Sequence, residues 1–165
     1  MKKIIVLLGS LLLINFCFAQ NGLSLQTVKD IKGKTKKVSD YVASEGLTVF
    51  VFWKTCCPNN LAMLEYLQEA IEEADSGDEP LTYVLVSVDD ARNASRVRPI
   101  IDSYGWKGSV ILDGNQEFAR RMNIIIPPQW LVVNSKGEEV FRCKITSSHT
   151  DVGAYLEQIK QLKQN

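Results

Sequence analysis

The sequence predicts an α/β domain of three layers, with a central mixed β-sheet flanked by helices. Two segments, 47–53 and 81–88, are almost continuously apolar and rich in β-branched residues, which is typical of buried strands at the centre of a sheet. Segments with apolar residues at helical spacing alternate with them, as in a layered α/β domain. The 165 residues are 45% hydrophobic, enough for one domain with an apolar core. The 19 basic and 19 acidic side chains lack the basic excess that is usual in nucleic-acid-binding proteins.

Residues 1–19 have the pattern of a secretory signal peptide. A basic start is followed by an apolar run over residues 4–18 and by Ala19, a small residue suited to cleavage. A membrane anchor is the alternative, but the run is short for a span. Lipidation at Cys17 is disfavoured by the bulky residue before it. Cleavage leaves residues 20–165 as a single domain with a formal charge of −2, and contact with a membrane is expected only if the N-terminal segment is retained.

The first elements of the remaining chain are separated by polar turns. Residues 21–44 are polar and predict a short N-terminal hairpin or a loop, followed by the strand 47–53. From Pro58 onward, apolar residues recur at helical spacing until the turn at 76–80. The second buried strand, 81–88, comes next.

The later elements are shorter, and turn residues separate them. They are a helix over 95–104 with Pro99 in its first turn or at a kink, an apolar run at 109–112, a helix over 116–122, a hairpin of strands 130–133 and 140–145, and a closing amphipathic helix over 152–162. This order predicts a mixed sheet.

The chemistry is expected in the loop after the first buried strand, within residues 52–60. Reactive groups in open α/β sheets gather at the carboxyl ends of the strands. Cys57 precedes Pro58, and proline is favoured as the first residue of a helix. The Cys57 thiol is therefore expected at a helix N-terminus, where backbone N–H groups and the helix dipole stabilise a thiolate. A buried, unreactive cysteine is the alternative.

Residues 52–60, with the sequence FWKTCCPNN, resemble the active-site segment Phe-Trp-Ala-Thr-Trp-Cys-x-x-Cys of the TlpA/ResA-type exported thiol–disulfide oxidoreductases, which belong to the thioredoxin-like superfamily. Three further segments resemble this family in the same order: 28–40 its N-terminal hairpin, 84–90 its next strand, and 126–137 its Ile-Pro-Thr-Thr-Phe-Leu-Ile-Asp-x-x-Gly segment. The resemblance implies a thioredoxin-like fold for residues 20–165, thiol–disulfide exchange, and a location in the periplasm or cell envelope.

The active-site motif departs from that of the family. Cys57 matches the attacking cysteine, but Asn60 occupies the position of the resolving cysteine, so that Cys-Pro-Asn-Asn replaces Cys-x-x-Cys. An amide cannot attack a mixed disulfide, and the usual intramolecular release of the substrate is therefore absent. Cys56 replaces a tryptophan, and Val51 replaces the buried carboxylate of classical thioredoxins.

The same resemblance implies a cis-proline that faces the reactive cysteine. Counting back from Gly137 favours Pro128 as this residue, and Pro127 then lacks the backbone N–H that normally pairs with the substrate chain. In the alternative register Pro127 is the cis residue, and the residue before it keeps its N–H. We expect Trp53, Pro58 and both of these prolines to line the groove for a client protein.

The other two cysteines of the mature chain have different expectations. The Cys56 thiol could attack a mixed disulfide at Cys57 and form a strained bond between neighbours. It could also be a packing or solvent-edge residue, and this interpretation is favoured. Cys143 alternates with Phe141 and Ile145 on one face of the last strand and is predicted to lie in the core.

No metal or other cofactor is expected. Adjacent thiols chelate a metal poorly, and His149 lies in a distant loop, where it is interpreted as a surface residue. Asp89 and Asp90 end a strand without a second acidic cluster, and they are interpreted as turn and helix-cap residues.

Two functions are left open. In the favoured one, the protein is an enzyme of the cell envelope that uses Cys57 as a single thiol to reduce or shuffle disulfides of client proteins or thiols, with an upstream thiol reductant as a second partner. In the other, the protein is a redox-inactive module that binds a partner protein through the cis-proline groove. Asn60 and Pro127 favour the module, whereas the Cys57–Pro58 pair favours exchange. Nucleic acid is not an expected partner of either.

Overall fold

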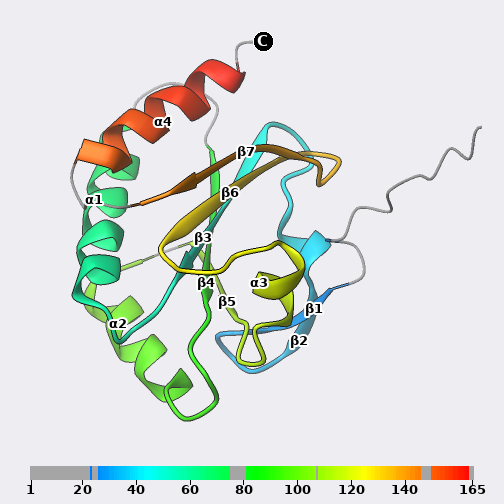
Figure 1. Cartoon of the computed structure of the whole chain (residues 1–165), viewed down its shortest axis with the longest axis vertical. Coiled ribbons are helices and arrows are strands. Elements are labelled where there is room, and N and C mark those ends of the chain that lie inside the picture. Colours follow the sequence, from blue (N-terminus) through cyan, green and yellow to red (C-terminus); the bar gives the residue numbers. More distant parts are fainter. Residues whose placement is uncertain (1–22, 24–25, 75–80, 107, 146–149, 164–165) are drawn as a thin grey trace, which may run out of the picture.

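A central sheet with helices on both sides organises the chain (Figure 1). The computed structural model describes residue 23 and residues 26–74, 81–106, 108–145 and 150–163. The predicted signal peptide, residues 1–19, lies outside the described residues, and the domain boundary at residue 20 stays a prediction. Within the described ranges, no helix is both long enough and apolar enough to cross a membrane.

The sheet has seven strands in the order β2-β1-β5-β4-β3-β6-β7. Strands β3, β4 and β5 are parallel, whereas β6 lies antiparallel to β3 and β7 antiparallel to β6. The strand bounds are β1 Thr27–Asp30, β2 Thr35–Lys37, β3 Leu47–Trp53, β4 Thr82–Ser87, β5 Ser109–Leu112, β6 Gln129–Asn134 and β7 Glu139–Lys144. The sheet is therefore mixed, with its most buried strand, β3, between β4 and β6.

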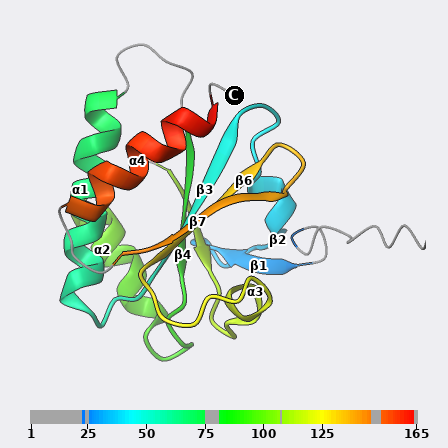
Figure 2. The same cartoon turned by 45° about the horizontal axis from the view of Figure 1, so that its top comes forward.

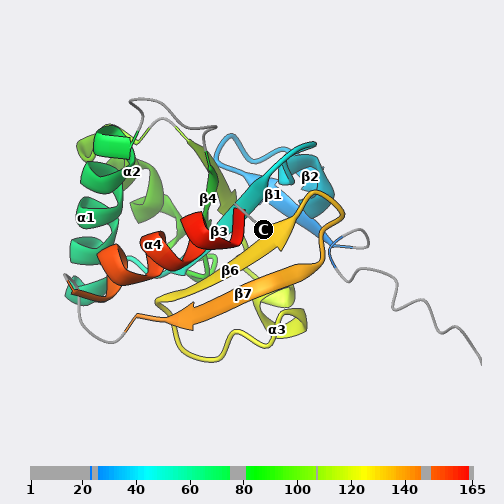
Figure 3. The same cartoon turned by 90° about the horizontal axis from the view of Figure 1, so that it is seen from above.

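The helices form the two outer layers. They are α1 Pro58–Ala74, α2 Val97–Ser103, α3 Glu117–Arg121 and α4 Thr150–Lys163, with two short 3-10 helices at Val38–Tyr41 and Ala94–Arg96. Helices α1, α2 and α4 cover one face of the sheet, and α3 lies on the other (Figures 2 and 3). This is the three-layer arrangement that the sequence predicts.

Strand β3 is buried on both faces, which explains its continuous apolar sequence. Val51 and Trp53 point to the face covered by α1, α2 and α4. Phe50 and Phe52 point to the opposite face. There Phe118 of α3 packs its ring against both, with centroids 5.4 Å from Phe50 and 5.1 Å from Phe52.

The structure confirms the predicted elements with small changes. The helix expected over 95–104 begins as a 3-10 turn, and Pro99 lies in the first turn of α2, where its missing N–H removes no intrahelical bond. The N-terminal hairpin forms from β1 and β2. Its antiparallel pairing with β5, through Lys29 opposite Leu112, was not predicted, because no local pattern reports which distant strand a hairpin joins.

Candidate functional site

The carboxyl ends of two parallel strands meet at one edge of the sheet. Trp53, the last residue of β3, pairs with Ser87 of β4. The backbone N–H of Val88 then donates to the carbonyl of Trp53, at 3.0 Å. The loop that carries Cys56 and Cys57 starts here and leads into α1. The candidate site is therefore at the edge of the sheet where reactive groups of open α/β folds gather.

Cys57 lies directly before α1, as predicted. Its carbonyl accepts hydrogen bonds from the backbone N–H groups of Asn60 (2.9 Å) and Leu61 (3.4 Å), which close the first turn of the helix. Pro58 is the first helical residue and is exposed. The Cys57 side chain is half-buried and carries a thiol.

The two neighbouring thiols contact each other. Cys56 is exposed, and its Sγ lies 3.4 Å from the Sγ of Cys57, within hydrogen-bond distance for two sulfur atoms. Cys56 therefore does not pack in the core in place of a tryptophan. It lies at the solvent edge, as the favoured interpretation allowed, but its sulfur is within hydrogen-bond distance of the Cys57 sulfur.

The environment raises the pKa of Cys57 above that of an ordinary thiol. The largest cause is the hydrogen bond with Cys56, followed by burial, while the positive charge of Lys54 acts in the opposite direction and the carboxylate of Asp89 adds a small increase. The expectation of a thiolate stabilised by the helix N-terminus is therefore wrong in direction. A hydrogen bond that a thiol donates is lost when the thiol ionises, so such a bond favours the protonated form.

Asp89 anchors the loop that carries the thiols. Its carboxylate is only 5% exposed and accepts hydrogen bonds from the backbone N–H of Thr55 (3.2 and 3.0 Å), the Thr55 hydroxyl (2.7 Å) and the Ser87 hydroxyl (2.8 Å). The sequence interpretation is confirmed for Asp90 only as a turn residue: its Oδ1 accepts from the backbone N–H of Asn93 at 3.0 Å, whereas Asn93 and not Asp90 is the N-cap of the following 3-10 helix. For Asp89 it is wrong, because this side chain points inward to the neighbouring strand's loop.

Asn60 braces the same loop from the helix side. The side chain is 2% exposed, and its Oδ1 accepts from the backbone N–H of Lys54 at 3.0 Å. The residue in the resolving position thus closes the loop between β3 and α1. Because the Asn60 side chain is buried and its oxygen already accepts a hydrogen bond from the loop backbone, Asn60 has a structural role here.

The predicted cis peptide bond lies between Pro127 and Pro128, which is the favoured register. Pro128 is buried, and its carbonyl accepts from the backbone N–H of Ile145 at 3.1 Å. The next residue, Gln129, pairs with Phe52 of β3. Because β3 and β6 are antiparallel, the start of β6 and the end of β3 share one edge of the sheet, which brings the proline pair beside the thiol loop.

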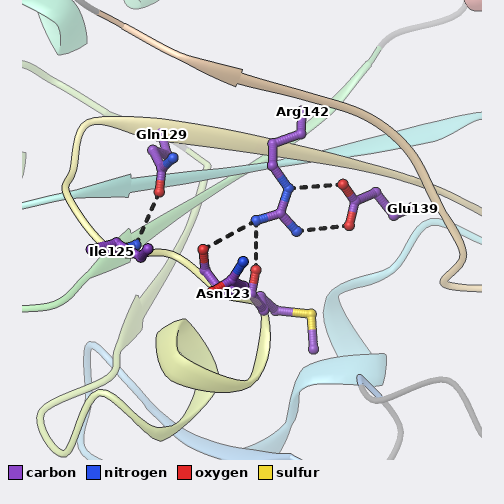
Figure 4. Close-up of polar contacts among 6 residues, drawn as sticks. Asn123, Ile125, Gln129, Glu139 and Arg142 are labelled. Atoms are coloured by element: carbon purple, nitrogen blue, oxygen red, sulfur yellow. Dashed lines mark hydrogen bonds and ion pairs between the residues drawn. The ribbon is translucent and has the colours of Figure 1, made fainter.

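The segment before the prolines is pinned to the last hairpin (Figure 4). Arg142 of β7 donates to the carbonyls of Met122 (2.6 Å) and Asn123 (3.4 Å), and it forms a bidentate ion pair with Glu139 at 2.8 and 2.7 Å. The backbone N–H of Ile125 donates to Oε1 of Gln129 at 3.2 Å. No sequence pattern points to Arg142, because its partners are carbonyl groups of a segment 19–20 residues away in the chain.

This pinned segment presents apolar side chains to solvent. Ile125 is 77% exposed and Ile126 is 56% exposed, next to the half-buried Pro127. Two adjacent aliphatic side chains exposed in this way, beside the thiol loop, form an apolar surface of the kind that can bind another molecule.

Trp53 does not line this surface. The expectation that it walls the groove is wrong, because its side chain is fully buried under α1 in the core. The alternation of β3 puts Trp53 on the helix-covered face, away from solvent. Cys143 is buried in the same core, as predicted.

No group of three His, Cys, Asp or Glu side chains that could hold a metal ion is present in the part of the chain that the structure describes. His149 lies outside that part. The site as described therefore consists of two thiols, a carboxylate anchor and a proline segment.

Comparison with known proteins identifies the fold. No protein-family model and no curated protein sequence matches the chain. An uncharacterized thioredoxin-like protein from Porphyromonas gingivalis is 27% identical, with a TM-score of 0.70 over 87% of this chain and 93% of that chain. The chain has a thioredoxin-like fold.

Two further thioredoxin-like structures agree. A secreted disulfide oxidoreductase of Mycobacterium tuberculosis, homologous to E. coli DsbE, is 12% identical, with a TM-score of 0.65 over 82% of this chain and 95% of that chain. The bacterioferritin comigratory protein of Xanthomonas campestris is 13% identical, with a TM-score of 0.70 over 86% and 94%. The finer assignment to the TlpA/ResA type stays a prediction.

Proposed function

We propose that the protein is an exported thiol–disulfide exchange enzyme in which Cys57 attacks a disulfide of a client. The observation that carries the proposal is the position of the Cys57 thiol. It directly precedes α1 at the carboxyl end of β3, at the edge of the sheet where the Pro127–Pro128 segment also lies. Exchange needs an accessible thiol at a surface that can hold a second chain, and this edge offers both.

The first step is a displacement at sulfur. Cys57 loses its proton and its thiolate attacks one sulfur of the client disulfide. A Cys57–client disulfide forms as the client S–S bond breaks, and the second client sulfur leaves with the electron pair and takes up a proton. A second thiol must then attack the mixed disulfide. Asn60 cannot supply it, so the second thiol comes either from an upstream thiol reductant or from the neighbouring Cys56.

The exposed surface favours clients with apolar residues near the disulfide. Ile125, Ile126 and Pro58 are exposed and offer aliphatic contact area near the thiol loop. Pro127 supplies no backbone donor, which makes strand-like pairing with a client weaker than side-chain contact here. The formal charge of −2 on residues 20–165 gives no reason to expect nucleic acid as a partner.

The proposed location is the periplasm or cell envelope. The signal-peptide pattern of residues 1–19 supports export. A secreted oxidoreductase and an exposed lipoprotein thioredoxin of Streptococcus pneumoniae, 19% identical with a TM-score of 0.62 over 82% of this chain and 98% of that chain, are among the proteins of similar fold. In such a compartment disulfide-bearing clients are common.

A redox-inactive module that binds a partner through the same surface is the second candidate. The raised pKa of Cys57 favours it, because less of the thiol is ionised at neutral pH. The buried Asn60 and the missing donor of Pro127 also favour it.

The substitution Cys57→Ser separates the two candidates. In mature protein that also carries Cys56→Ser, so that the exposed neighbouring thiol is absent, exchange predicts that Cys57→Ser loses all reduction of a small aromatic disulfide, whereas Cys143→Ser, a change at a buried cysteine, keeps the parent rate. Full turnover by Cys57→Ser would refute exchange through Cys57. Capture of a partner that survives in Cys57→Ser, together with no turnover by the wild type, would establish the binding module instead.

A further inference from the structure

We infer that Cys56 is the resolving thiol of this protein, so that the redox pair is two neighbouring cysteines in place of a Cys-x-x-Cys pair. The inference rests on the proposed exchange through Cys57 and names the group that completes it. The main observation in its support is the distance of 3.4 Å between the Sγ atoms of Cys56 and Cys57. When the Cys57 sulfur forms a mixed disulfide with a client, the Cys56 thiol is therefore already within contact distance of it.

The position normally used for resolution is occupied by a structural residue. Asn60 is 2% exposed, and its acceptor is committed to the backbone N–H of Lys54. It cannot move toward the thiols without opening the loop between β3 and α1. Cys56, by contrast, is exposed and has its sulfur directed at Cys57.

The loop holds the two thiols together from both ends. On one side, Thr55 is fixed to the buried carboxylate of Asp89 through its backbone N–H and its hydroxyl. On the other side, Cys57 leads into the first turn of α1, closed by the bond from Asn60 to its carbonyl. Two groups held together in this way react as if at high local concentration, because folding of the loop has already met the entropic cost of bringing them together.

The resolving step balances without a further oxidant. The Cys56 thiol loses its proton, and its thiolate attacks the Cys57 sulfur of the mixed disulfide. A Cys56–Cys57 disulfide forms, the bond to the client breaks, and the client sulfur leaves as a thiol with that proton. Over both steps two protein thiols are oxidised to one disulfide and one client disulfide is reduced to two thiols. A dithiol reductant then returns the pair to the thiol form.

Covalent geometry makes the oxidised pair easy to reduce. Consecutive Cα atoms are about 3.8 Å apart across a trans peptide bond. Ordinary disulfides span about 4.4–6.8 Å between Cα atoms, and shorter spans store strain that makes the bond more reducible. The Cys56–Cys57 disulfide is therefore a short-lived intermediate of a reductase, and the dithiol is the resting form.

The test follows one turnover with 5,5′-dithiobis(2-nitrobenzoate) as the disulfide, in mature protein carrying Cys143→Ser. With Cys56 and Cys57 present, each protein molecule releases two aromatic thiols and ends two hydrogen atoms lighter, with no adduct. With Cys56→Ser added, which keeps the size and a hydrogen-bonding group, one aromatic thiol is released and a stable adduct remains on Cys57. Equally stable adducts with and without Cys56 overturn the inference.

Further measurements separate this inference from the proposed function. Cys57→Ser tests exchange itself: if it releases aromatic thiol as fast as the parent, the proposed function fails and the resolving role fails with it. If Cys57→Ser releases aromatic thiol only slowly, through the exposed Cys56, but Cys56→Ser still loses its adduct at the parent rate, only the resolving role fails. Phenylarsine oxide, which binds two thiols at once, tests the pair in the unsubstituted protein. One equivalent should block the reaction, and failure to bind overturns the pairing.

Discussion

At the scale of single residues, the acidity of Cys57 depends on its neighbour. The hydrogen bond with Cys56 is the largest cause of the raised pKa, so Cys56→Ala should lower the pKa of Cys57. An acid with a lower pKa ionises at lower pH, and only the thiolate is alkylated. The rate of Cys57 alkylation by iodoacetamide, measured against pH in Cys143→Ser protein, should therefore have its midpoint at lower pH once Cys56 is alanine.

A second substitution controls for a general change in the loop. The positive charge of Lys54 lowers the pKa of Cys57. Adding Lys54→Met to the Cys56→Ala protein should move the midpoint back toward higher pH. A midpoint that stays in place in both variants would show that neither group acts on the thiol.

Residues close together in the sequence were predictable, and residues that meet across strands were not. The position of Cys57 before a helix follows from the adjacent Pro58, and the loss of a resolving thiol at Asn60 follows from the resemblance of residues 52–60 to the active-site segment of the TlpA/ResA-type family. Asp89 holds the thiol loop only because β3 and β4 are paired in one particular register. The sequence suggested that Trp53 lines the groove, whereas it lies in the core. A strand that is buried on both faces has no polar positions that would show which side chains point to which face.

At the scale of elements, Arg142 fixes the segment before the cis-proline. One guanidinium makes a bidentate pair with Glu139 and reaches the carbonyls of Met122 and Asn123. Lysine has no planar fork and cannot make these contacts together. Arg142→Lys should speed amide hydrogen exchange in residues 122–126 several-fold and weaken client binding, while amide hydrogen exchange in β3 stays unchanged.

The matched control is Lys144→Gln, which removes an exposed positive charge from the same strand. It should leave amide hydrogen exchange in residues 122–126 at the wild-type rate. The ion pair also sets a pH dependence, because Arg142 holds the pKa of Glu139 below its ordinary value. Its contribution is complete above the unfolded pKa and is lost as the pH falls through the lower, folded pKa. If amide hydrogen exchange in residues 122–126 stayed as slow in Arg142→Lys as in the wild type at neutral pH, Arg142 would not be the residue that fixes this segment.

Hairpins made of neighbouring segments could be predicted from the sequence, whereas the pairing of strands that are far apart in the chain could not. The hairpin of β6 and β7 has a turn between two apolar runs, which the pattern shows directly. The pairing of β1 with β5 joins segments far apart in the chain. Such pairings are selected by the packing of the whole sheet, which no local pattern contains.

At the scale of the whole molecule, one sheet separates two apolar clusters. Leu67 lies in the cluster under α1, α2 and α4, and Phe118 lies in the cluster under α3. Strand β3 contributes alternate side chains to both, so neither cluster can be lost without disturbing the strand that the other needs. The domain should therefore unfold in a single transition, as small single domains generally do.

Two substitutions on opposite faces test this coupling. Phe118→Ala should lower the free energy of unfolding by about 3–5 kcal/mol, and Leu67→Ala by about 2–5 kcal/mol, because each leaves a cavity in a packed core. Urea unfolding can be followed by far-UV circular dichroism and by the fluorescence of Trp53 and Trp130, which are both buried on the face of Leu67. The two signals should share one midpoint in each variant, and the exposed Ile125→Ala should change stability by less than about 0.5 kcal/mol. If Phe118→Ala moved the circular dichroism midpoint but not the fluorescence midpoint, the two faces would be separate units. The thiol loop, which β3 leads into, would then depend on one of them alone.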